Sequence, residues 1–189
     1  MIKNNCVLLI IDMQKGMQMT KLPPRNNPQA EANIALLLAH WRAAQMPVVH
    51  VRHLSREPAS VFWPGQIGAE FQDALIPALS EHIVDKNVTD AFAHSGLEKW
   101  LLNHGVDKVI IAGVSINISV EATTRSCASL GFKTVVVSDA TFTFDRVDIA
   151  GAMKSAEELH LASLSNLSGE YACVLDTASV LRELETASN

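Results

Sequence analysis

The sequence predicts an α/β protein: a three-layer α/β/α sandwich, in one domain over residues 1–189, with a mostly parallel sheet of about six strands. Three observations predict it. Short apolar runs rich in β-branched residues recur along the chain, and longer amphipathic stretches alternate with them. With 189 residues, 48% of them hydrophobic and 19% charged, the chain is long enough to bury one core.

The predicted strands are apolar without interruption rather than at every second residue. Such a run indicates a strand covered on both faces, as in a parallel sheet. The expected strands are residues 6–11, 47–52, 82–85, 108–112, 134–138 and 171–175.

The stretches between the strands predict helices. The expected helices are residues 27–45, 97–104, 117–130, 148–164 and 177–185. Asn27 before Pro28 favours a capped start for the first, and Gly131 is a suitable residue just beyond the end of the third. The remaining stretch, residues 54–68, contains Phe62 and Trp63 and is long for a loop. It fits either a flap over a site or a surface loop whose aromatic rings pack down.

Charge and cysteine content exclude several classes of partner. The net charge is −5 and no block of Lys or Arg occurs, so we expect no binding to nucleic acid or membrane. No apolar stretch approaches the ~18 residues that a membrane span needs. Three cysteines without a spacing pattern predict reduced thiols, and no signal peptide is recognisable, so we expect a cytoplasmic protein.

Polar residues follow several of the predicted strands. Asp12, His53, Lys86 and the turn at residues 113–119 all come at carboxyl ends. In open parallel sheets, ligands bind outside these ends. Each residue alone also has an ordinary structural interpretation, but their convergence at one edge indicates a site.

Three motifs resemble those of the isochorismatase-like hydrolases, a superfamily of cysteine hydrolases with a Rossmann-like fold. Residues 10–14 read Ile-Ile-Asp-Met-Gln, residues 86–92 read Lys-Asn-Val-Thr-Asp-Ala-Phe, and residues 113–120 read Gly-Val-Ser-Ile-Asn-Ile-Ser-Val. The resemblance runs nearly end to end. It implies a catalytic triad of Asp12, Lys86 and residue 119, in which Asp takes a thiol proton, Lys stabilises the charge and the thiolate attacks an amide-like carbonyl.

The chain departs from the family pattern at two positions. Ile116 replaces a usual Thr, and Ser119 replaces the usual Cys. A serine hydroxyl is much harder to deprotonate than a thiol and normally needs a strong neighbouring base. Three explanations stay open: a substitution made to disable the enzyme, a native but weaker nucleophile, or a reaction that needs no nucleophile. Vinyl-ether hydrolysis with Asp12 as general acid, the reaction of isochorismatases proper, is the third case.

The resemblance also implies a cis peptide bond between Val114 and Ser115. Together with the N–H of Ser119, the turn would form an oxyanion hole. We expect no metal site and no cofactor. The nicotinamidases of the family carry an Asp-x-His zinc motif, whereas here residues 50–53 read His-Val-Arg-His. His50 and His53 face opposite ways on a strand, and His50 is expected to be a core imidazole.

We therefore expect a hydrolase that acts on a small amide, imide or ureido C–N bond, and a homo-oligomer, either a dimer or a tetramer. The alternatives are vinyl-ether hydrolysis and a catalytically silent module that binds a small molecule. A nucleotide-binding domain is disfavoured, because no Gly-rich phosphate loop follows the first strand. The expected substrate contacts are Gln14, Arg52, His53, Phe62, Trp63 and Phe92.

Overall fold

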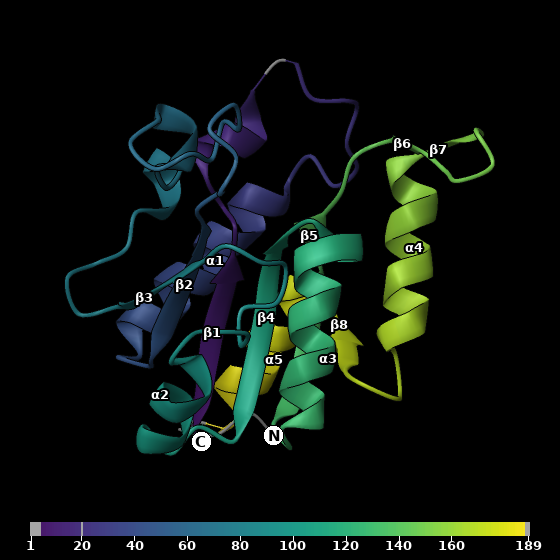
Figure 1. Cartoon of the computed structure of the whole chain (residues 1–189). Helices are drawn as coiled ribbons and strands as arrows, with labels where there is room; N and C mark the ends of the chain where they lie inside the picture. The colour runs from purple at the N-terminus through teal and green to yellow at the C-terminus, as the bar shows by residue number, and fades with distance from the viewer. Residues whose placement is uncertain (1–4, 20, 188–189) are drawn as a thin grey trace.

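A computed structural model describes residues 5–19 and 21–187, and its centre is a six-stranded parallel sheet (Figure 1). The strand order is β3-β2-β1-β4-β5-β8. The strands are β1 (Cys6–Ile11), β2 (Val48–His53), β3 (His82–Lys86), β4 (Lys108–Val114), β5 (Lys133–Phe142) and β8 (Cys173–Leu175). All five neighbouring pairs are parallel, so the predicted fold class is confirmed.

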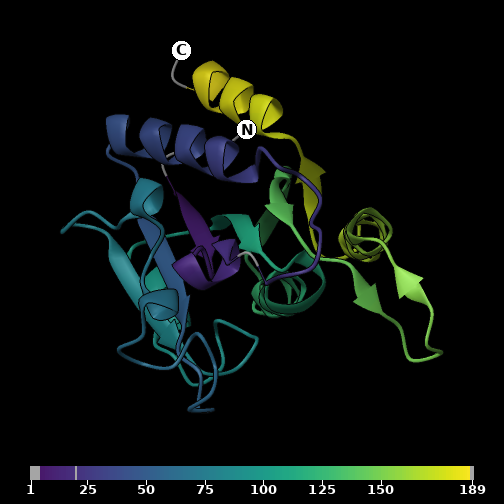
Figure 2. The same ribbon diagram turned by 90° about the horizontal axis from the view of Figure 1, so that it is seen from above.

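Helices cover both faces of this sheet (Figure 2). They are α1 (Ala30–Ala43), α2 (Leu97–Asn103), α3 (Glu121–Ser129), α4 (Ala156–Leu167) and α5 (Thr177–Ala187). One apolar core joins α1 and α5 to the face that carries Leu8 and Ile10, and a second joins α2, α3 and α4 to the face that carries Leu9 and Ile11. Every residue of β1 is buried, as its unbroken apolar sequence predicts.

The strand order reverses direction between β1 and β4. From β1 the chain proceeds to β2 on one side, and later to β4 on the other. At such a reversal the connections leave the carboxyl ends of the two strands in opposite directions, which opens a crevice between them. Asp12 follows β1 and the turn at residues 113–119 follows β4, so both lie at this point.

One predicted helix begins later than expected. Residues 146–154 form a hairpin of β6 (Arg146–Val147) and β7 (Met153–Lys154), and α4 begins only at Ala156. Ser155 caps α4 in a reciprocal capping box with Glu158, which fixes where the helix starts. The hairpin projects from the body of the molecule beside α4 (Figure 2).

The predicted cap of the first helix is also wrong. Asn27 adopts a left-handed backbone (φ 45°), and its side-chain amide donates to the carbonyl oxygens of Ser138 and Thr141. The helix α1 starts at Ala30 without a side-chain cap. Asn27 therefore ties the segment before α1 to β5. Among the described residues, no helix is both long and apolar enough to cross a membrane.

Candidate active site

Three polar side chains meet at the carboxyl edge of the sheet. The Lys86 ammonium donates to Asp12 Oδ2 at 2.8 Å and to Ser119 Oγ at 3.2 Å. All three residues are buried, with Ser119 the most exposed at 8%. Lys86 therefore bridges the carboxylate and the hydroxyl in a site with little room for bulk water. The predicted trio is brought together from β1, β3 and the turn after β4.

Asp12 is held in an unusual state by both its backbone and its surroundings. Its φ of 54° is left-handed, a conformation that Asp tolerates better than most residues and that is often found at functional sites. Burial raises the pKa of its carboxyl, and the charge and hydrogen bond of Lys86 offset this only in part. Its second oxygen, Oδ1, is buried without a hydrogen-bond partner among the described residues. Asp12 thus has a free oxygen that can exchange a proton.

Lys86 is positioned by contacts beyond the trio. Its ammonium makes a third hydrogen bond, to the carbonyl oxygen of Val88 at 3.2 Å. The loop that follows is attached to α3, because Thr123 Oγ1 accepts from the Ala91 N–H and the Ser126 hydroxyl donates to Asp90. The acceptor at Val88 is a backbone carbonyl, so no pattern of side chains could have predicted this contact.

Ser119 lies in a turn that depends on Gly113. A Cβ atom at Gly113 would lie 2.1 Å from the carbonyl oxygen of Ile11, and its φ of 125° is left-handed. Only glycine allows β4 to approach β1 so closely. The Val114–Ser115 peptide bond is cis, and residues 116–120 form one π-helical turn in which the Ser115 carbonyl accepts from the Val120 N–H. This wide turn leads into α3 and carries Ser119 next to Lys86.

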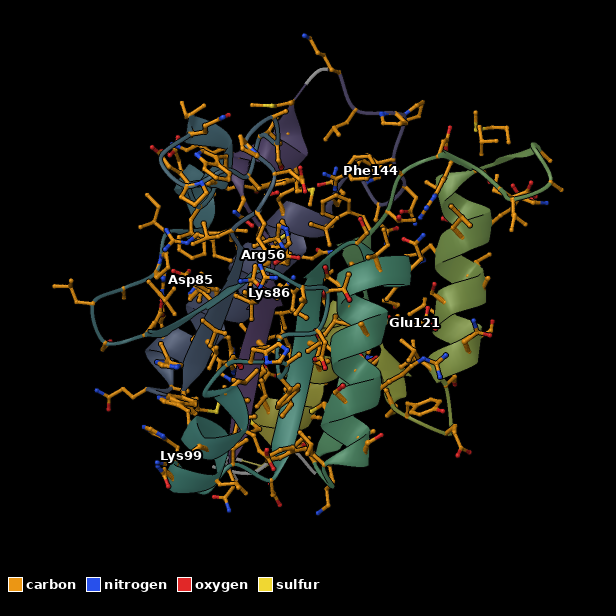
Figure 3. The ribbon with its side chains drawn as sticks, in the orientation of Figure 1. Arg56, Asp85, Lys86, Lys99, Glu121 and Phe144 are labelled. Carbon is orange, nitrogen blue, oxygen red and sulfur yellow. The ribbon has the colours of Figure 1, made fainter. Side chains whose placement is uncertain are left out.

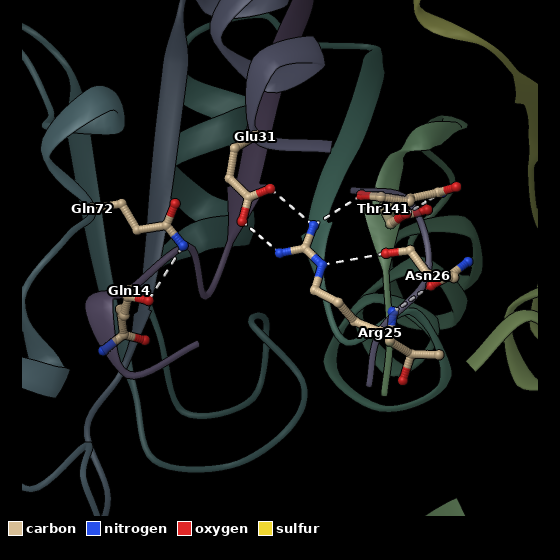
Figure 4. A network of polar contacts seen from close by, with 8 residues as sticks. Gln14, Arg25, Asn26, Glu31, Gln72 and Thr141 are labelled. Carbon is tan, nitrogen blue, oxygen red and sulfur yellow. Dashed lines mark hydrogen bonds and ion pairs between the residues drawn. The ribbon is translucent and has the colours of Figure 1, made fainter. Parts of the chain in front are cut away.

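Gln14, expected to contact substrate, instead joins three backbone segments. Its side-chain amide donates to the carbonyl oxygens of His53 and Ala69, and its carbonyl accepts from the His53 N–H. The Gln72 side chain donates to the backbone carbonyl oxygen of Gln14 (Figure 4). Every strong hydrogen-bonding group of the Gln14 side chain except one lone pair is thereby occupied. Gln14 holds the end of β2 and the loop after it against β1.

A second, partly buried network lies on the other side of β1. Arg25 binds both carboxylate oxygens of Glu31, at 2.6 and 2.8 Å (Figure 4). Its guanidinium also lies over the ring of Phe142. It fastens the segment before α1 to the end of β5. The charge of Arg25 is thus already paired.

The two expected substrate contacts at the end of β2, Arg52 and His53, lie on opposite faces of the sheet. His53 is the register partner of Lys86 on the neighbouring strand, and burial together with the Lys86 charge lowers the pKa of its imidazole. A neutral His53 therefore stands beside the trio. Arg52 points the other way and forms two hydrogen bonds at 2.8 Å with Asp85, so the structure does not bring it to the trio.

Of the three aromatic residues expected to contact substrate, only Phe62 packs against a residue beside the trio. Phe62 packs edge-on against His53, with ring centroids 6.1 Å apart, and lies directly over Gly16. This contact brings the loop at residues 54–68 to the site. Phe92 instead stacks on Phe132 and packs against the second core, and Trp63 is half-buried in the loop.

Sequence analysis missed two residues near this edge. Arg56, from the loop after β2, donates to Asn87, the neighbour of Lys86; Lys86 and Arg56 lie close together at the end of β3 in Figure 3. Asn117 lies two residues before Ser119 and accepts a hydrogen bond from Thr143 at 2.6 Å. Asn117 is part of the third motif, which was the signal available. Among the described residues, no group of three or more His, Cys, Asp or Glu could hold a metal ion.

A family model, the isochorismatase domain, matches residues 6–179 of this chain. The chain belongs to the isochorismatase family. Uncharacterised isochorismatase family protein YrdC of Bacillus subtilis is 34% identical over 176 residues, covering 93% of this chain and 94% of the relative. Nicotinamidase 3 of Arabidopsis thaliana is 30% identical, covering 94% and 87%.

Solved structures of the family agree with this assignment. An isochorismatase-family protein from Chromobacterium violaceum superposes with a TM-score of 0.95 at 41% identity, covering 98% of this chain and 96% of that protein. The chain is therefore a hydrolase of the isochorismatase family, and the expected family, fold and enzyme class are confirmed. The roles of the individual site residues remain predictions.

Proposed function

We propose that this hydrolase cleaves the C–N bond of a small amide, imide or ureido compound. The observation that carries the proposal is the buried Lys86 ammonium, which contacts both the Asp12 carboxylate and the Ser119 hydroxyl. One relative is named a nicotinamidase, which by its name acts on an amide. In this proposal Asp12 is the base, Lys86 the electrostatic partner and Ser119 the nucleophile, in the place of a cysteine.

The proposed reaction proceeds through an ester. Asp12 accepts the Ser119 proton while the hydroxyl oxygen attacks the substrate carbonyl carbon, and the resulting oxyanion is stabilised by N–H groups of the turn after β4. The C–N bond breaks as the nitrogen leaves with the proton from Asp12. Water then hydrolyses the ester, with Asp12 taking and returning one proton. Because burial raises its pKa, Asp12 is a stronger base than an ordinary carboxylate. Serine remains a weaker nucleophile than cysteine here, so turnover should be slow.

Vinyl-ether hydrolysis is the second candidate, and one observation favours it. A raised pKa makes Asp12 more able to carry a proton, and its Oδ1 has no partner among the described residues. Asp12 would protonate the alkene carbon, water would add to the oxocarbenium ion, and the hemiketal would collapse to a ketone and an alcohol. Residue 119 has no covalent role in this reaction.

The test compares the protein with Ser119→Cys, Ser119→Ala and Asp12→Ala on small amides, ureido acids and isochorismate, following ammonia and pyruvate. Ammonia release that rises with Cys and disappears with Ala supports the amidohydrolase. Pyruvate release that is indifferent to residue 119 but absent in Asp12→Ala establishes the vinyl-ether reaction and overturns the first proposal. A pocket that binds these compounds without turnover in either the Ser or the Cys form is a silent binding module.

The pH profile separates the two reactions by sign. Asp12 as base must be ionised, so amide hydrolysis declines as the pH falls through a pKa above the ordinary value of 3.8. Asp12 as acid must be protonated, so vinyl-ether hydrolysis declines as the pH rises through the same pKa. We further propose that the protein is cytoplasmic, which its three free cysteines support. We also propose that it is a homo-oligomer, and sedimentation of the purified protein tests this.

A further inference from the structure

His53 is held in place through both its backbone and its ring. The Gln14 side chain, which is fully buried, accepts from the His53 N–H at 2.8 Å and donates to the His53 carbonyl oxygen at 2.9 Å. The ring packs edge-on against Phe62, and the Phe62 carbonyl oxygen in turn accepts from the Ser55 N–H. These contacts leave the imidazole little freedom to turn away from the trio.

The His53 ring lies on the same face of the sheet as Lys86. The two residues are register partners on neighbouring parallel strands, which run about 5 Å apart. Val51 and Val84, two residues earlier on each strand, belong to the core beneath α2, α3 and α4. Because side chains alternate between the faces of a strand, His53 and Lys86 continue this face beyond the core, and Lys86 reaches Ser119 there.

The Val88 carbonyl oxygen joins the two side chains. Lys86 Nζ donates to it at 3.2 Å, and the His53 ring also forms a hydrogen bond with the Val88 backbone. This second bond acts to raise the pKa of the imidazole, as a bond to an acceptor does, so the Val88 group involved is its carbonyl oxygen. A carbonyl oxygen has two lone pairs and can accept from two donors at once. His53 and Lys86 therefore share one acceptor.

The bond to Val88 uses the last donor of Lys86. An ammonium has three N–H groups, and those of Lys86 go to Asp12, Ser119 and Val88. Because the angles between the three N–H bonds are fixed, an acceptor that holds one of them also sets the direction of the other two. Without the Val88 carbonyl the ammonium could rotate about its Cε–Nζ bond, and the donor to Ser119 would no longer be fixed.

The His53 ring is better suited to hold this carbonyl than to exchange protons. Burial and the Lys86 charge lower the pKa of the imidazole, and the Asp12 carboxylate offsets this only in part. The ring is therefore neutral at pH 7, and its single N–H is committed to the Val88 carbonyl. A neutral donor holds the carbonyl without placing a second cation next to Lys86.

We propose that His53 is a positioning residue: its ring holds the Val88 carbonyl, and this carbonyl fixes the Lys86 ammonium. The other two N–H groups of Lys86 then stay directed at the Asp12 carboxylate and the Ser119 hydroxyl. This role rests on the proposed function of Lys86 as the electrostatic partner, whichever bond the enzyme cleaves. In both proposed reactions Asp12 exchanges a proton, and the charge of Lys86 acts on the pKa of Asp12.

Turnover tests this role with variants that differ in hydrogen bonding. His53→Leu removes the donor, whereas His53→Gln and His53→Asn each place an amide N–H near one of the two ring nitrogens. On the substrate panel above, kcat of His53→Leu should fall about ten- to a hundredfold while KM stays within about twofold, because the lost bond acts on Lys86 and not on bound substrate. Either His53→Gln or His53→Asn should restore most of the lost kcat.

His82→Leu is the matched control. His82 is also a half-buried imidazole, but it lies at the opposite end of β3 from Lys86, so its replacement should leave kcat unchanged. A parental kcat in His53→Leu would overturn the positioning role. Losses in His53→Gln and His53→Asn as large as that in His53→Leu would also overturn it, because they would assign a proton transfer to the ring itself.

NMR tests the same role without turnover. The Lys86 side chain is fully buried and makes three hydrogen bonds, so its ammonium protons should exchange slowly enough to give a nitrogen–proton signal, which is assigned through its own side-chain carbons. Loss of the His53 donor should speed this exchange at least about tenfold in His53→Leu, and His82→Leu should not change it. Exchange as slow in His53→Leu as in the parent, or a parent without a Lys86 signal, overturns the role.

The two measurements also separate this role from the proposed function. A Lys86 signal that depends on His53, in a protein that hydrolyses nothing in the panel, sinks the proposed function while the positioning role stands. Amide hydrolysis that continues at the parental rate in His53→Leu, with an unchanged Lys86 signal, sinks the positioning role while the proposed function stands.

Discussion

The two ends of β3 each carry an ion pair with a buried carboxylate side chain, and the two pairs are built differently. At the start of the strand, Glu81 binds Arg42 through both oxygens and also accepts from His50 and the Ala78 N–H. Burial alone would raise the pKa of Glu81, but these hydrogen bonds lower it to about 2. At the end of the strand, Lys86 binds Asp12. Burial raises the pKa of the Asp12 carboxyl.

The difference lies in how many donors each carboxylate receives. Glu81 has partners on both oxygens, whereas Asp12 has an oxygen with none among the described residues. A carboxylate whose oxygens are all satisfied is locked in its charged form and serves stability, while one left short of donors can exchange a proton. A carboxylate paired with a cation thus stabilises the fold at one edge of the sheet and is a candidate acid–base group at the other.

Asp12→Asn gives the largest expected effect. Asparagine keeps the shape of the side chain but can neither take nor give the proton, so kcat should fall about 10²- to 10⁴-fold in whichever reaction the protein performs. The kinetics are measured on the substrate panel above. Glu81→Gln is the matched carboxylate-to-amide control and should leave kcat unchanged; a loss of kcat as large as that of Asp12→Asn would erase the distinction between the two pairs.

Gly113→Ala tests the approach of β4 to β1 that brings Ser119 to Lys86. The new methyl group would overlap the Ile11 backbone, so we expect a loss of more than about 4 kcal/mol in the free energy of unfolding, or no folded protein. Gly151→Ala is the control, since Gly151 also has a positive φ but its Cβ would meet nothing within 4 Å. That change should cost only about 1–2 kcal/mol. Urea denaturation measures both, and equal losses would contradict the close approach.

Glu81→Gln should lower the free energy of unfolding by about 1–3 kcal/mol. The change leaves Arg42 without its anion, but Arg42 is partly exposed and regains some hydration, which keeps the loss below that of a fully buried pair. Chemical denaturation at pH 7 gives the value. A variant as stable as the parent would show that the Arg42–Glu81 ion pair contributes nothing to stability.

The pH dependence of stability is the smallest and most specific effect. Burial lowers the pKa of His50, so the unfolded chain takes up that proton first and stability declines as the pH falls below 6.5. Glu81 has a folded pKa of about 2 against an ordinary 4.5, so its contribution is complete above pH 4.5 and is lost as the pH falls from 4.5 to 2. Urea melts from pH 7 to 3 should show both declines. Glu81→Gln should remove most of the decline in stability below pH 4.5. If that decline is unaltered in the variant, it arises from other groups.

The sheet and the trio could be predicted because their signals are local in sequence. Unbroken apolar runs mark strands covered on both faces, and Asp12 directly follows such a run. Lys86 instead ends β3, an edge strand in which only Val84 and Lys86 are buried. The hairpin at residues 146–154 could not, because its strands have two residues each and its turn is held by the side chain of Asp148, which has no periodicity to detect. The hydrogen bonds of Gln14 could not be predicted from the sequence either, since its partners are backbone groups distant in sequence.

The properties of the native thiols allow a cysteine introduced by Ser119→Cys to be alkylated selectively. Burial raises the pKa of Cys6 to about 11 and that of Cys127 to about 12, and both are enclosed in the cores, so neither reacts at neutral pH in the folded protein. Cys173 is the only exposed thiol in the described part of the chain. With Cys173 replaced by Ser, iodoacetamide uptake followed by mass spectrometry would count a single label, and its rate against pH would titrate the thiol at position 119 directly.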